Sequence, residues 1–452
     1  MKSVNPANNI MIREYAEHSP EEVTGIIESV HLSWLSWKES TFEYRGSLFL
    51  KAAQILRDRK EELARLMTLE MGKIIRESKA EIEKCAVACD FFASNAKALL
   101  KDQVIPSDAT RSFVAFQPLG VILAVMPWNF PFWQVFRFAA PSMMAGNTAV
   151  LKHASNVPGC ALAIESIFHE AGFPENVFRT LMIPSSKMEA VVEHPHVKAV
   201  TLTGSEFAGS QVAMTAGKMI KKTVLELGGS DPFIVLDDAD LEASVKTAIT
   251  ARMLNQGQSC IAAKRFIVME AVLDEFTSRL KEGFGELKIG DPLEMDTQVG
   301  PMARPDLVDD IHRQVERSIE AGAILVTGGK RPDRAGCYYL PTILTGITKS
   351  MPVYHEETFG PVVSIISVST EEEAIRVAND SPFGLGGSVW TKDTTRGESV
   401  ARKVETGAMF VNGLTKSDPR LPFGGIKKSG YGRELAEYGI KEFVNIKTIW
   451  IA

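Results

Sequence analysis

The chain has 452 residues, 45% of them hydrophobic, so it is long enough to bury the cores of two or three domains. Its 50 basic and 56 acidic residues give a formal charge of -6, and no stripe of Lys and Arg matches the pattern expected for a phosphate backbone. Length and charge therefore exclude a single small module and argue against nucleic acid as a partner.

The N-terminal segment lacks the charged and then apolar layout of a signal peptide, and no apolar run is long enough to cross a bilayer. We therefore expect a cytoplasmic protein with no membrane partner. The five cysteines are odd in number and lack the paired spacing of metal ligands, so we expect neither disulfides nor a metal site. Even Cys85 and Cys89, which share one face of an expected helix, are better explained as small packing residues.

Two patterns follow one another along the chain. The first hundred residues are helical in periodicity, with apolar residues three and four positions apart. From Ser112, short β-rich runs alternate with helical stretches, and a second such alternation begins at Phe233. This order predicts parallel, doubly wound sheets, so we expect two α/β domains with a tight connection near 225–232 and the active site between them. Two β-prone segments at the domain margins, 111–117 and 443–452, could be edge strands that pair with another subunit.

The most informative segment is MLNQGQSCIAAKR, in which Cys260 follows a Gly-Gln-Ser turn and precedes a strand. A thiol in such a turn can face a cleft, where backbone N–H groups would favour its thiolate and stabilise an oxyanion. Taken alone, a buried structural cysteine explains the residue equally well. The interpretation of Cys260 therefore depends on the residues around it.

Glu226 and Asn129 are candidate partners for that thiol. Glu226 ends an apolar strand and is followed by two glycines, so its carboxylate can serve as a general base whose pKa rises with partial burial. Asn129 lies among bulky rings in PWNFP, where its amide can donate to a developing oxyanion. A solvated or capping Glu226, and an Asn129 that satisfies a turn, are the alternatives.

Eight motifs occur in order along the chain, namely PWNFP, LKHAS, TLTGSEFAG, LELGG, NQGQSC, EETFGP, GAMFVNG and PFGGIKKSGYGRE. Together they resemble the aldehyde dehydrogenase superfamily across practically the whole sequence. The resemblance implies an α/β fold with a doubly wound Rossmann-type cofactor domain, a second α/β catalytic domain, and a small β element that forms a homodimer or homotetramer. The implied boundaries are 1–104 and 119–227 for the dinucleotide-binding domain, 228–431 for the catalytic domain, and 105–118 with 432–452 for the oligomerisation element.

Carried over position by position, the resemblance implies that Cys260 is the nucleophile and that Glu226 activates either the thiol or the hydrolytic water. Asn129 and the backbone N–H of Cys260 would form the oxyanion hole. Attack of the thiolate on an aldehyde would give a thiohemiacetal, loss of hydride to a nicotinamide dinucleotide would give a thioester, and water would release the acid.

The dinucleotide is expected where a strand meets a helix. Gly204 and Gly209 lie at that helix N-terminus, where the backbone can approach a pyrophosphate, although an ordinary βα turn is the alternative. The resemblance adds Ser205 beside the pyrophosphate and Lys152 at the adenine-side ribose. The remaining implied cofactor residues are Trp128, Leu227 and, at the nicotinamide ribose, Glu357 and Phe359.

Ser155 bears on the choice of dinucleotide. Relatives that prefer NAD often carry an acidic residue three positions after the lysine, and this acid bonds the ribose hydroxyls and repels a 2′-phosphate. Here Ser155 occupies that position, and no carboxylate occurs between Lys152 and Glu165. A lysine and a small hydroxyl would accept a phosphate, so we expect NADP, with NAD as the alternative.

Arg137 is the candidate for substrate recognition, because it lies about two helical turns after Asn129. A cation beside an apolar channel suits a distal carboxylate, although an ion pair with a neighbouring acid explains it equally well. The chain is especially similar to the short bacterial branch of succinate semialdehyde dehydrogenases, which have this arginine and a serine that matches Ser417. Leu254 stands where some members have a second arginine, so Lys416 or Arg420 would have to assist.

Three hypotheses remain open. The first is NAD(P)-dependent oxidation of succinate semialdehyde, and the second is oxidation of another short aldehyde, such as glutarate semialdehyde or an aliphatic aldehyde. The third is a non-enzymatic scaffold or binding protein, against which the intact Cys260, Glu226 and Asn129 argue. A coenzyme A-dependent acylating enzyme is disfavoured because Glu226, which is useful for activating water, is present.

Overall fold

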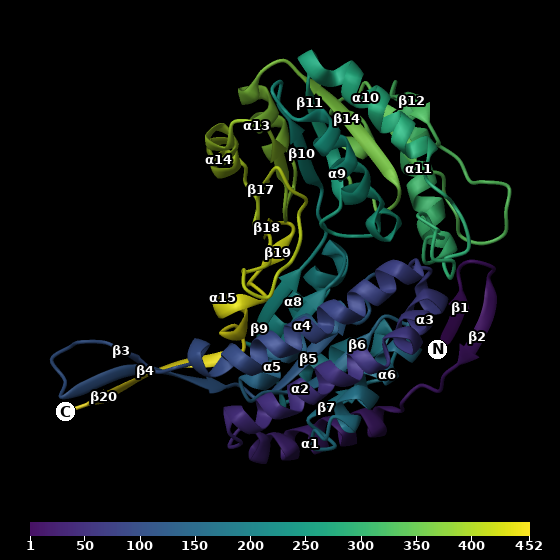
Figure 1. Cartoon of the computed structure of the whole chain (residues 1–452). Helices are drawn as coiled ribbons and strands as arrows, with labels where there is room; N and C mark the ends of the chain where they lie inside the picture. The colour runs from purple at the N-terminus through teal and green to yellow at the C-terminus, as the bar shows by residue number, and fades with distance from the viewer.

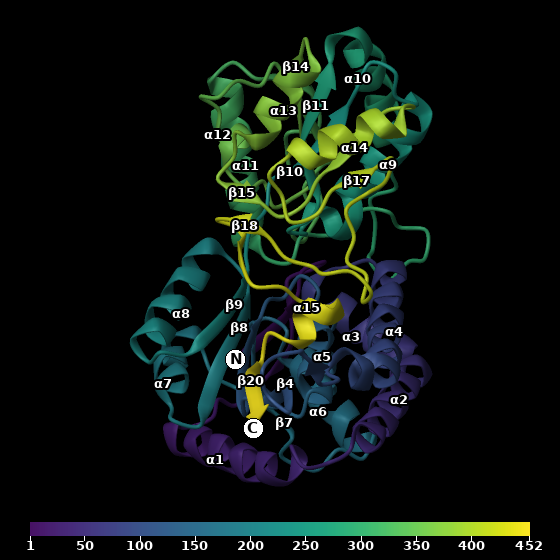
Figure 2. The same cartoon turned by 90° about the vertical axis from the view of Figure 1, so that its left-hand side faces the viewer.

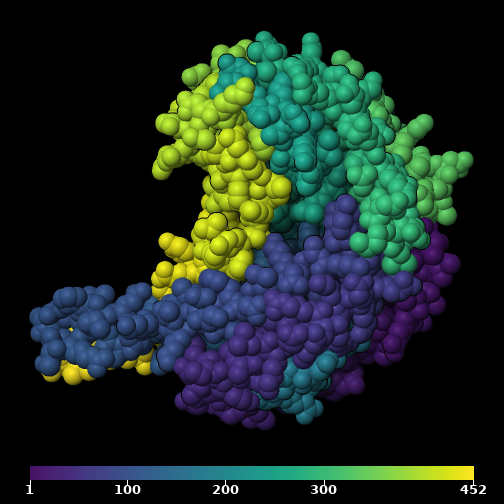
Figure 3. All heavy atoms as spheres, in the orientation of Figure 1, coloured from purple at the N-terminus to yellow at the C-terminus, as the bar shows by residue number.

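The computed structural model describes all 452 residues, which form two lobes and a projecting arm (Figure 1). The N-terminal half of the chain builds the lower lobe in that view, and most of the C-terminal half builds the upper lobe. A space-filling view shows how far the arm stands out from the body (Figure 3). No helix combines the length and the apolar character needed to span a membrane.

The first lobe is built on a six-stranded sheet in the order β19-β9-β8-β5-β6-β7. Alternate residues of β5 enter two separate cores, with Ile122 and Ala124 on one face and Val121 and Leu123 on the other. Both faces are therefore covered, as the sequence predicted for a doubly wound sheet. The strands are β5 (Val121–Met126), β6 (Thr148–His153), β7 (Phe178–Thr180), β8 (Val197–Thr203), β9 (Lys222–Glu226) and the antiparallel β19 (Gly430–Tyr431).

Helices of the first lobe divide between those two cores. One core packs against α1 (Pro20–Trp37), α7 (Met188–Glu193) and α8 (Glu206–Lys218), and a short 3₁₀ turn, η1 (Ser185–Lys187), precedes α7. The larger core packs against α2 (Phe42–Asp58), α3 (Lys60–Met71), α4 (Ile75–Leu99), α5 (Trp133–Met144) and α6 (Pro158–Glu170).

The second lobe holds a seven-stranded sheet in the order β12-β13-β14-β11-β10-β16-β17, parallel except for β12. Its strands are β10 (Asp231–Val235), β11 (Ala263–Met269), β12 (Ile324–Thr327), β13 (Thr342–Thr345), β14 (Val362–Val368), β16 (Ser388–Trp390) and β17 (Phe410–Val411). The helices are α9 (Leu241–Met253), α10 (Glu270–Gly285), α11 (Pro305–Glu320), α12 (Pro352–His355), α13 (Glu371–Asn379) and α14 (Thr394–Lys403), with the 3₁₀ turn η2 (Leu254–Gly257). A separate two-stranded sheet joins β15 (Phe383–Gly384) to β18 (Ile426–Lys427).

The arm is a three-stranded antiparallel sheet in which the two predicted β-prone margin segments form β4 and β20, while the short β3 was not predicted. It consists of β3 (Gln103–Val104), β4 (Arg111–Pro118) and β20 (Val444–Ile451), and α15 (Ala436–Ile440) leads into the last strand. Several of its large apolar side chains are exposed, among them Val104, Ile446 and Trp450. The arm thus has the uncovered strands and apolar surface expected of an oligomerisation element.

The N-terminus differs from the helical entry that the periodicity predicted. Residues before α1 form a hairpin of β1 (Lys2–Asn5) and β2 (Ile10–Glu14). The hairpin contacts the second lobe, where the backbone N–H of Cys337 donates to the carbonyl of Pro6 at 2.8 Å. A partner so distant in the sequence leaves no local periodic signal, which explains why the hairpin was missed.

Candidate active site

A cavity of about 360 Å³ lies between the lobes, at the ends of β5, β8 and β9. Thr203 and Arg304 contribute to its wall together with residues predicted from the sequence. Eight predicted site residues line it, namely Trp128, Asn129, Gly204, Ser205, Leu227, Cys260, Glu357 and Phe359. The cavity therefore brings the candidate nucleophile, the oxyanion donor and the nicotinamide-end residues together.

A second pocket continues this cavity along the first lobe and shares Thr203, Gly204 and Arg304 with it. Lys152 and Ser155 line the second pocket, and the Lys152 ammonium donates to the hydroxyl of Ser185 at 3.0 Å. Among the residues that line this pocket there is no Asp or Glu. The two pockets form one groove, which we call the dinucleotide groove.

Gly209 packs against Leu227, a residue that lines the groove. It lies in the first turn of α8, where a Cβ atom would be 2.5 Å from the Leu227 side chain, and it does not line either pocket. Its lack of a side chain lets α8 pack closely on the strand end that carries Leu227. Gly209 therefore shapes the groove through Leu227, and its approach to a pyrophosphate stays a prediction.

The nucleophile is presented by a buried turn with unusual backbone angles. Asn255, Gln256 and Gly257 all have positive φ, of 53°, 54° and 74°. Such conformations cost about 1 to 3 kcal/mol for each non-glycine residue, so tertiary contacts must hold them. The Asn255 N–H donates to the Glu77 carboxylate at 2.8 Å, and the Ala303 N–H donates to the amide oxygen of Gln258 at 2.9 Å.

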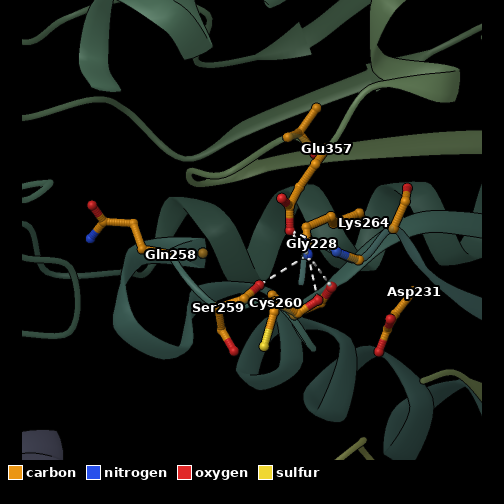
Figure 4. Close-up of polar contacts among 12 residues, drawn as sticks. Gly228, Asp231, Gln258, Ser259, Cys260, Lys264 and Glu357 are labelled. Carbon is orange, nitrogen blue, oxygen red and sulfur yellow. Dashed lines mark hydrogen bonds and ion pairs between the residues drawn. The ribbon is translucent and has the colours of Figure 1, made fainter. Parts of the chain in front are cut away.

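Lys264 lies against the backbone of the turn that carries the thiol, as Figure 4 shows. Its buried ammonium donates to the carbonyls of Ser259 and Cys260, each at 2.9 Å, and lies 3.5 Å from the Glu357 carboxylate. Glu357 also accepts the backbone N–H of Gly229 at 2.9 Å. Lys264 therefore connects the nucleophile turn to a residue of the dinucleotide groove. The sequence analysis missed it, although a lysine in the apolar strand KRFIVM is an available signal.

The environment of Cys260 disfavours a free thiolate. Burial raises the pKa of the thiol to about 12, while the positive charges of Arg137 and Lys264 act in the opposite direction. The thiol therefore needs a base to become a nucleophile at neutral pH.

Glu226 ends β9 with a buried carboxylate whose two oxygens have no hydrogen-bond partner. Burial raises the pKa of this carboxyl well above its ordinary value, and the charge of Glu434 raises it further. Both effects make Glu226 a stronger base than a surface glutamate, as general-base chemistry requires.

The sequence analysis left open whether Arg137 is a free cation in an aldehyde channel or is paired with an acid of the protein, and the structure shows the pair. Its buried guanidinium forms an ion pair with Glu434, lies 4.6 Å from the centre of the Phe423 ring, and donates to the Thr203 hydroxyl at 3.3 Å. The carboxylate that Arg137 binds is thus one of the protein's own. Glu434 has no counterpart among the sequence-predicted residues, because it meets Arg137 only through the fold.

The Asn129 side chain is held ready to donate a hydrogen bond. Its amide nitrogen donates to the carbonyl of Gln258 at 3.1 Å, and its own backbone carbonyl accepts from the Asn255 amide at 2.8 Å. An amide nitrogen carries two hydrogens, so one remains for an oxygen in the cavity beside Cys260. This arrangement fits the oxyanion role.

The remaining substrate candidates lie on the loop after β17. The Ser417 hydroxyl is nearly buried and accepts a hydrogen bond from Lys84 at 2.7 Å. Arg420 is exposed and forms an ion pair with Asp418 at 2.6 Å. Neither Ser417 nor Arg420 lines the cavity that contains Cys260.

Comparisons with known proteins agree on one family. The model described as the aldehyde dehydrogenase family matches residues 1–449. A relative from Synechocystis sp., named probable succinate-semialdehyde dehydrogenase [NADP(+)], is 54% identical over 100% of this chain and 99% of its own length. Succinate-semialdehyde dehydrogenase [NADP(+)] 1 from Mycobacterium bovis is 47% identical over the same shares. A solved succinic semialdehyde dehydrogenase from Streptococcus pyogenes, in complex with NADP+, is 40% identical, has a TM-score of 0.98 and is covered to 99%, against 100% of this chain.

Removal of the Lys264 charge should make the thiol less reactive. In Lys264→Met the pKa of Cys260 should rise, so alkylation by iodoacetamide at a fixed alkaline pH should slow by about tenfold, equivalent to about one pKa unit. The rate is measured against pH with thermal melting as a check of the fold. Lys246→Met, an exposed lysine on α9, serves as the control, and an unchanged profile in Lys264→Met would refute this role.

Proposed function

The chain belongs to the aldehyde dehydrogenase family, and on that premise we propose that it oxidises succinate semialdehyde to succinate with NADP as the hydride acceptor. The observation that carries the reaction is the cavity that holds Cys260 beside Asn129 and Glu357. The substrate and cofactor are supported by relatives that are named for both and are similar over their whole length. The intact constellation argues against a binding protein without activity.

The residues of the dinucleotide groove fit NADP. Lys152 and Ser155 would hold the adenine-side ribose and its 2′-phosphate, since the lining there offers an ammonium and hydroxyls but no repelling carboxylate. Burial lowers the pKa of Lys152, which is the behaviour of an ammonium that gains from an anionic partner. Ser205 caps α8 and leaves backbone N–H groups at a helix N-terminus for the pyrophosphate. Glu357 would hold the nicotinamide ribose.

The first half of the reaction is thioester formation. Glu226 takes the proton of the Cys260 thiol, and the sulfur then forms a bond to the aldehyde carbon. The oxygen becomes an alkoxide that accepts hydrogen bonds from the Asn129 amide and the Cys260 backbone N–H. NADP, when bound, supplies the acceptor for the hydride of that carbon. The carbonyl re-forms as the carbon is oxidised, which leaves an acyl thioester on Cys260.

The second half is hydrolysis. Glu226 first releases the thiol proton to solvent. It then takes a proton from a water molecule, whose oxygen forms a bond to the thioester carbon. Asn129 and the backbone N–H again hold the alkoxide, and its collapse breaks the carbon–sulfur bond. The acid leaves and Cys260 departs as a thiolate. The raised pKa of Glu226 suits both proton transfers, because a more basic carboxylate takes a proton more readily.

We also propose that the protein acts as a homo-oligomer that assembles through the arm. Support comes from the exposed apolar side chains of β20 and from the strand edges that the three-stranded sheet leaves uncovered. A second copy of the same arm could cover both features, since closed symmetric pairing uses one surface twice.

The proposed function predicts a defined substrate and cofactor preference. The highest kcat/KM should be for succinate semialdehyde with NADP, when initial rates of reduced-nicotinamide absorbance are compared for succinate semialdehyde, glutarate semialdehyde and hexanal with NADP and with NAD. Cys260→Ala should lower turnover by about 1,000-fold or more, because no covalent intermediate can form. Cys337→Ala, which removes a buried thiol that does not line the cavity, is the control. Full turnover by Cys260→Ala would disprove the mechanism.

Ser155 is predicted to determine the choice of dinucleotide. In Ser155→Glu the ratio of kcat/KM for NADP to that for NAD should fall by about tenfold or more, because a carboxylate repels the 2′-phosphate. Ser155→Ala separates repulsion from the loss of a hydrogen bond, since it removes the hydroxyl without adding a charge. An unchanged ratio in Ser155→Glu would exclude Ser155 as the determinant.

A further inference from the structure

Asn255 connects the strained turn before Cys260 to its surroundings. Its side-chain amide donates to the carbonyl of Asn129 at 2.8 Å and to the carbonyl of Gln258 at 3.1 Å. Its backbone N–H donates to the Glu77 carboxylate at 2.8 Å. Asn255 therefore links the turn that carries the nucleophile to the loop that carries the oxyanion donor, and Glu77 holds Asn255 from outside the turn.

The bond between Asn255 and Glu77 is a charge-assisted one. A backbone N–H binds a carboxylate more strongly than it binds a neutral oxygen. The turn needs such a contact, because the positive φ angles of Asn255 and Gln256, 53° and 54°, are unfavourable by themselves. Glu77 is thus placed to keep the turn in a conformation that it would not hold alone.

The next acid on the same face of α4, Glu81, holds the loop on the other side of the cavity. Its carboxylate accepts the backbone N–H groups of Phe132 and Trp133, each at 2.9 Å, and forms a buried ion pair with Lys73. The Lys73 ammonium lies 3.6 Å from the centre of the Phe130 ring. These contacts fix the loop that carries the oxyanion donor to α4.

The helix α4 therefore holds both parts of the reaction centre. Glu77 and Glu81 are four positions apart, so they share a helix face and are separated by about 6 Å along the axis. Figure 1 and Figure 2 both place α4 in the first lobe, below α9 of the second lobe, which leads into the nucleophile turn. A rigid helix bound to both segments keeps the distance between them constant.

We propose that Glu77 is a positioning residue of the reaction, which holds the nucleophile turn so that the Cys260 sulfur and the Asn129 amide keep the arrangement that attack on the aldehyde requires. Glu77 does not line the cavity, so it acts through Asn255 and not on the substrate. The inference rests on the proposed function, because it assumes a reaction at Cys260. It adds a residue that belongs to none of the eight motifs.

Three variants of the full-length protein test this role. Glu77→Leu keeps a side chain of similar size without an acceptor, Glu77→Gln restores an oxygen acceptor, and Glu83→Leu removes a carboxylate of the same helix that pairs with Arg57 and Lys60. Burial raises the pKa of Glu77 to about 7, so all rates are measured at alkaline pH, where the carboxylate is charged. Kinetics with succinate semialdehyde and NADP give kcat and KM, quenching of protein fluorescence gives Kd for NADP, and thermal melting reports the fold.

Alkylation by iodoacetamide reports the turn without turnover, when it is measured by mass spectrometry on the peptide that contains Cys260. Burial is the main cause of the high pKa of this thiol, so a loosened turn that admits water should lower the pKa and speed alkylation. Cys85 and Cys89 are fully buried on α4 and serve as internal controls for a general loss of the fold.

In Glu77→Leu, kcat should fall by about tenfold or more, because misplaced groups react slowly, while Kd for NADP changes by less than about twofold. Alkylation of Cys260 should become about threefold faster or more, with Cys85 and Cys89 unreactive, and Glu77→Gln should largely restore both wild-type values.

Unchanged kcat and alkylation in Glu77→Leu, equal effects in Glu83→Leu, or alkylation of Cys85 and Cys89 together with Cys260 would overturn the inference. A wild-type enzyme that does not oxidise succinate semialdehyde would instead contradict the proposed function, and the alkylation rates would still decide whether Glu77 holds the turn.

Discussion

The active site depends on one buried ammonium that ties the nucleophile turn to the wall of the dinucleotide groove. Lys264 donates to the carbonyls of Ser259 and Cys260 and reaches the Glu357 carboxylate. An ammonium so deeply buried is stable only if its donors are satisfied, so its partners are held in one arrangement. That arrangement sets the thiol facing the groove, and it relates the reacting sulfur to the residue expected to hold the nicotinamide ribose.

Elsewhere in the junction between the lobes, buried charged groups must likewise be stabilised by partners within the protein. Glu226 and Glu434 are both buried carboxylates, and Arg137 stabilises their charges from one side. The result is a strongly basic Glu226 in the same lobe junction as a thiol whose own pKa is high. Transfer of the thiol proton to the Glu226 carboxylate moves the negative charge from one buried group to another and creates no new charge, so it costs less than ionising the thiol alone in a dry cavity. The groove for the dinucleotide applies the same principle to an anion that comes from outside.

The sequence patterns predicted those site residues that directly follow a strand or belong to a recognisable motif. Asn129, Gly204 and Leu227 follow β5, β8 and β9, and they line one cavity because the carboxyl ends of parallel strands share an edge of the sheet. Cys260 lies in the turn before β11 and reaches the same cavity from the second lobe. The close packing of Gly209 on the Leu227 side chain was not predicted, because no helical periodicity reveals that neighbour.

What the sequence determined by itself was the alternation of strands and helices, the division into two α/β units, the apolar margins that became the arm, and the motifs that identify the family. Each of these features can be predicted from the types and the spacing of residues that are close together in the sequence. The tertiary structure alone decided which charges meet. Arg137 pairs with Glu434, and Lys84 contacts Ser417 across 333 positions of sequence. The physical reason is that the strength and partner of a charge depend on burial, and burial is created only when distant segments exclude water from one another.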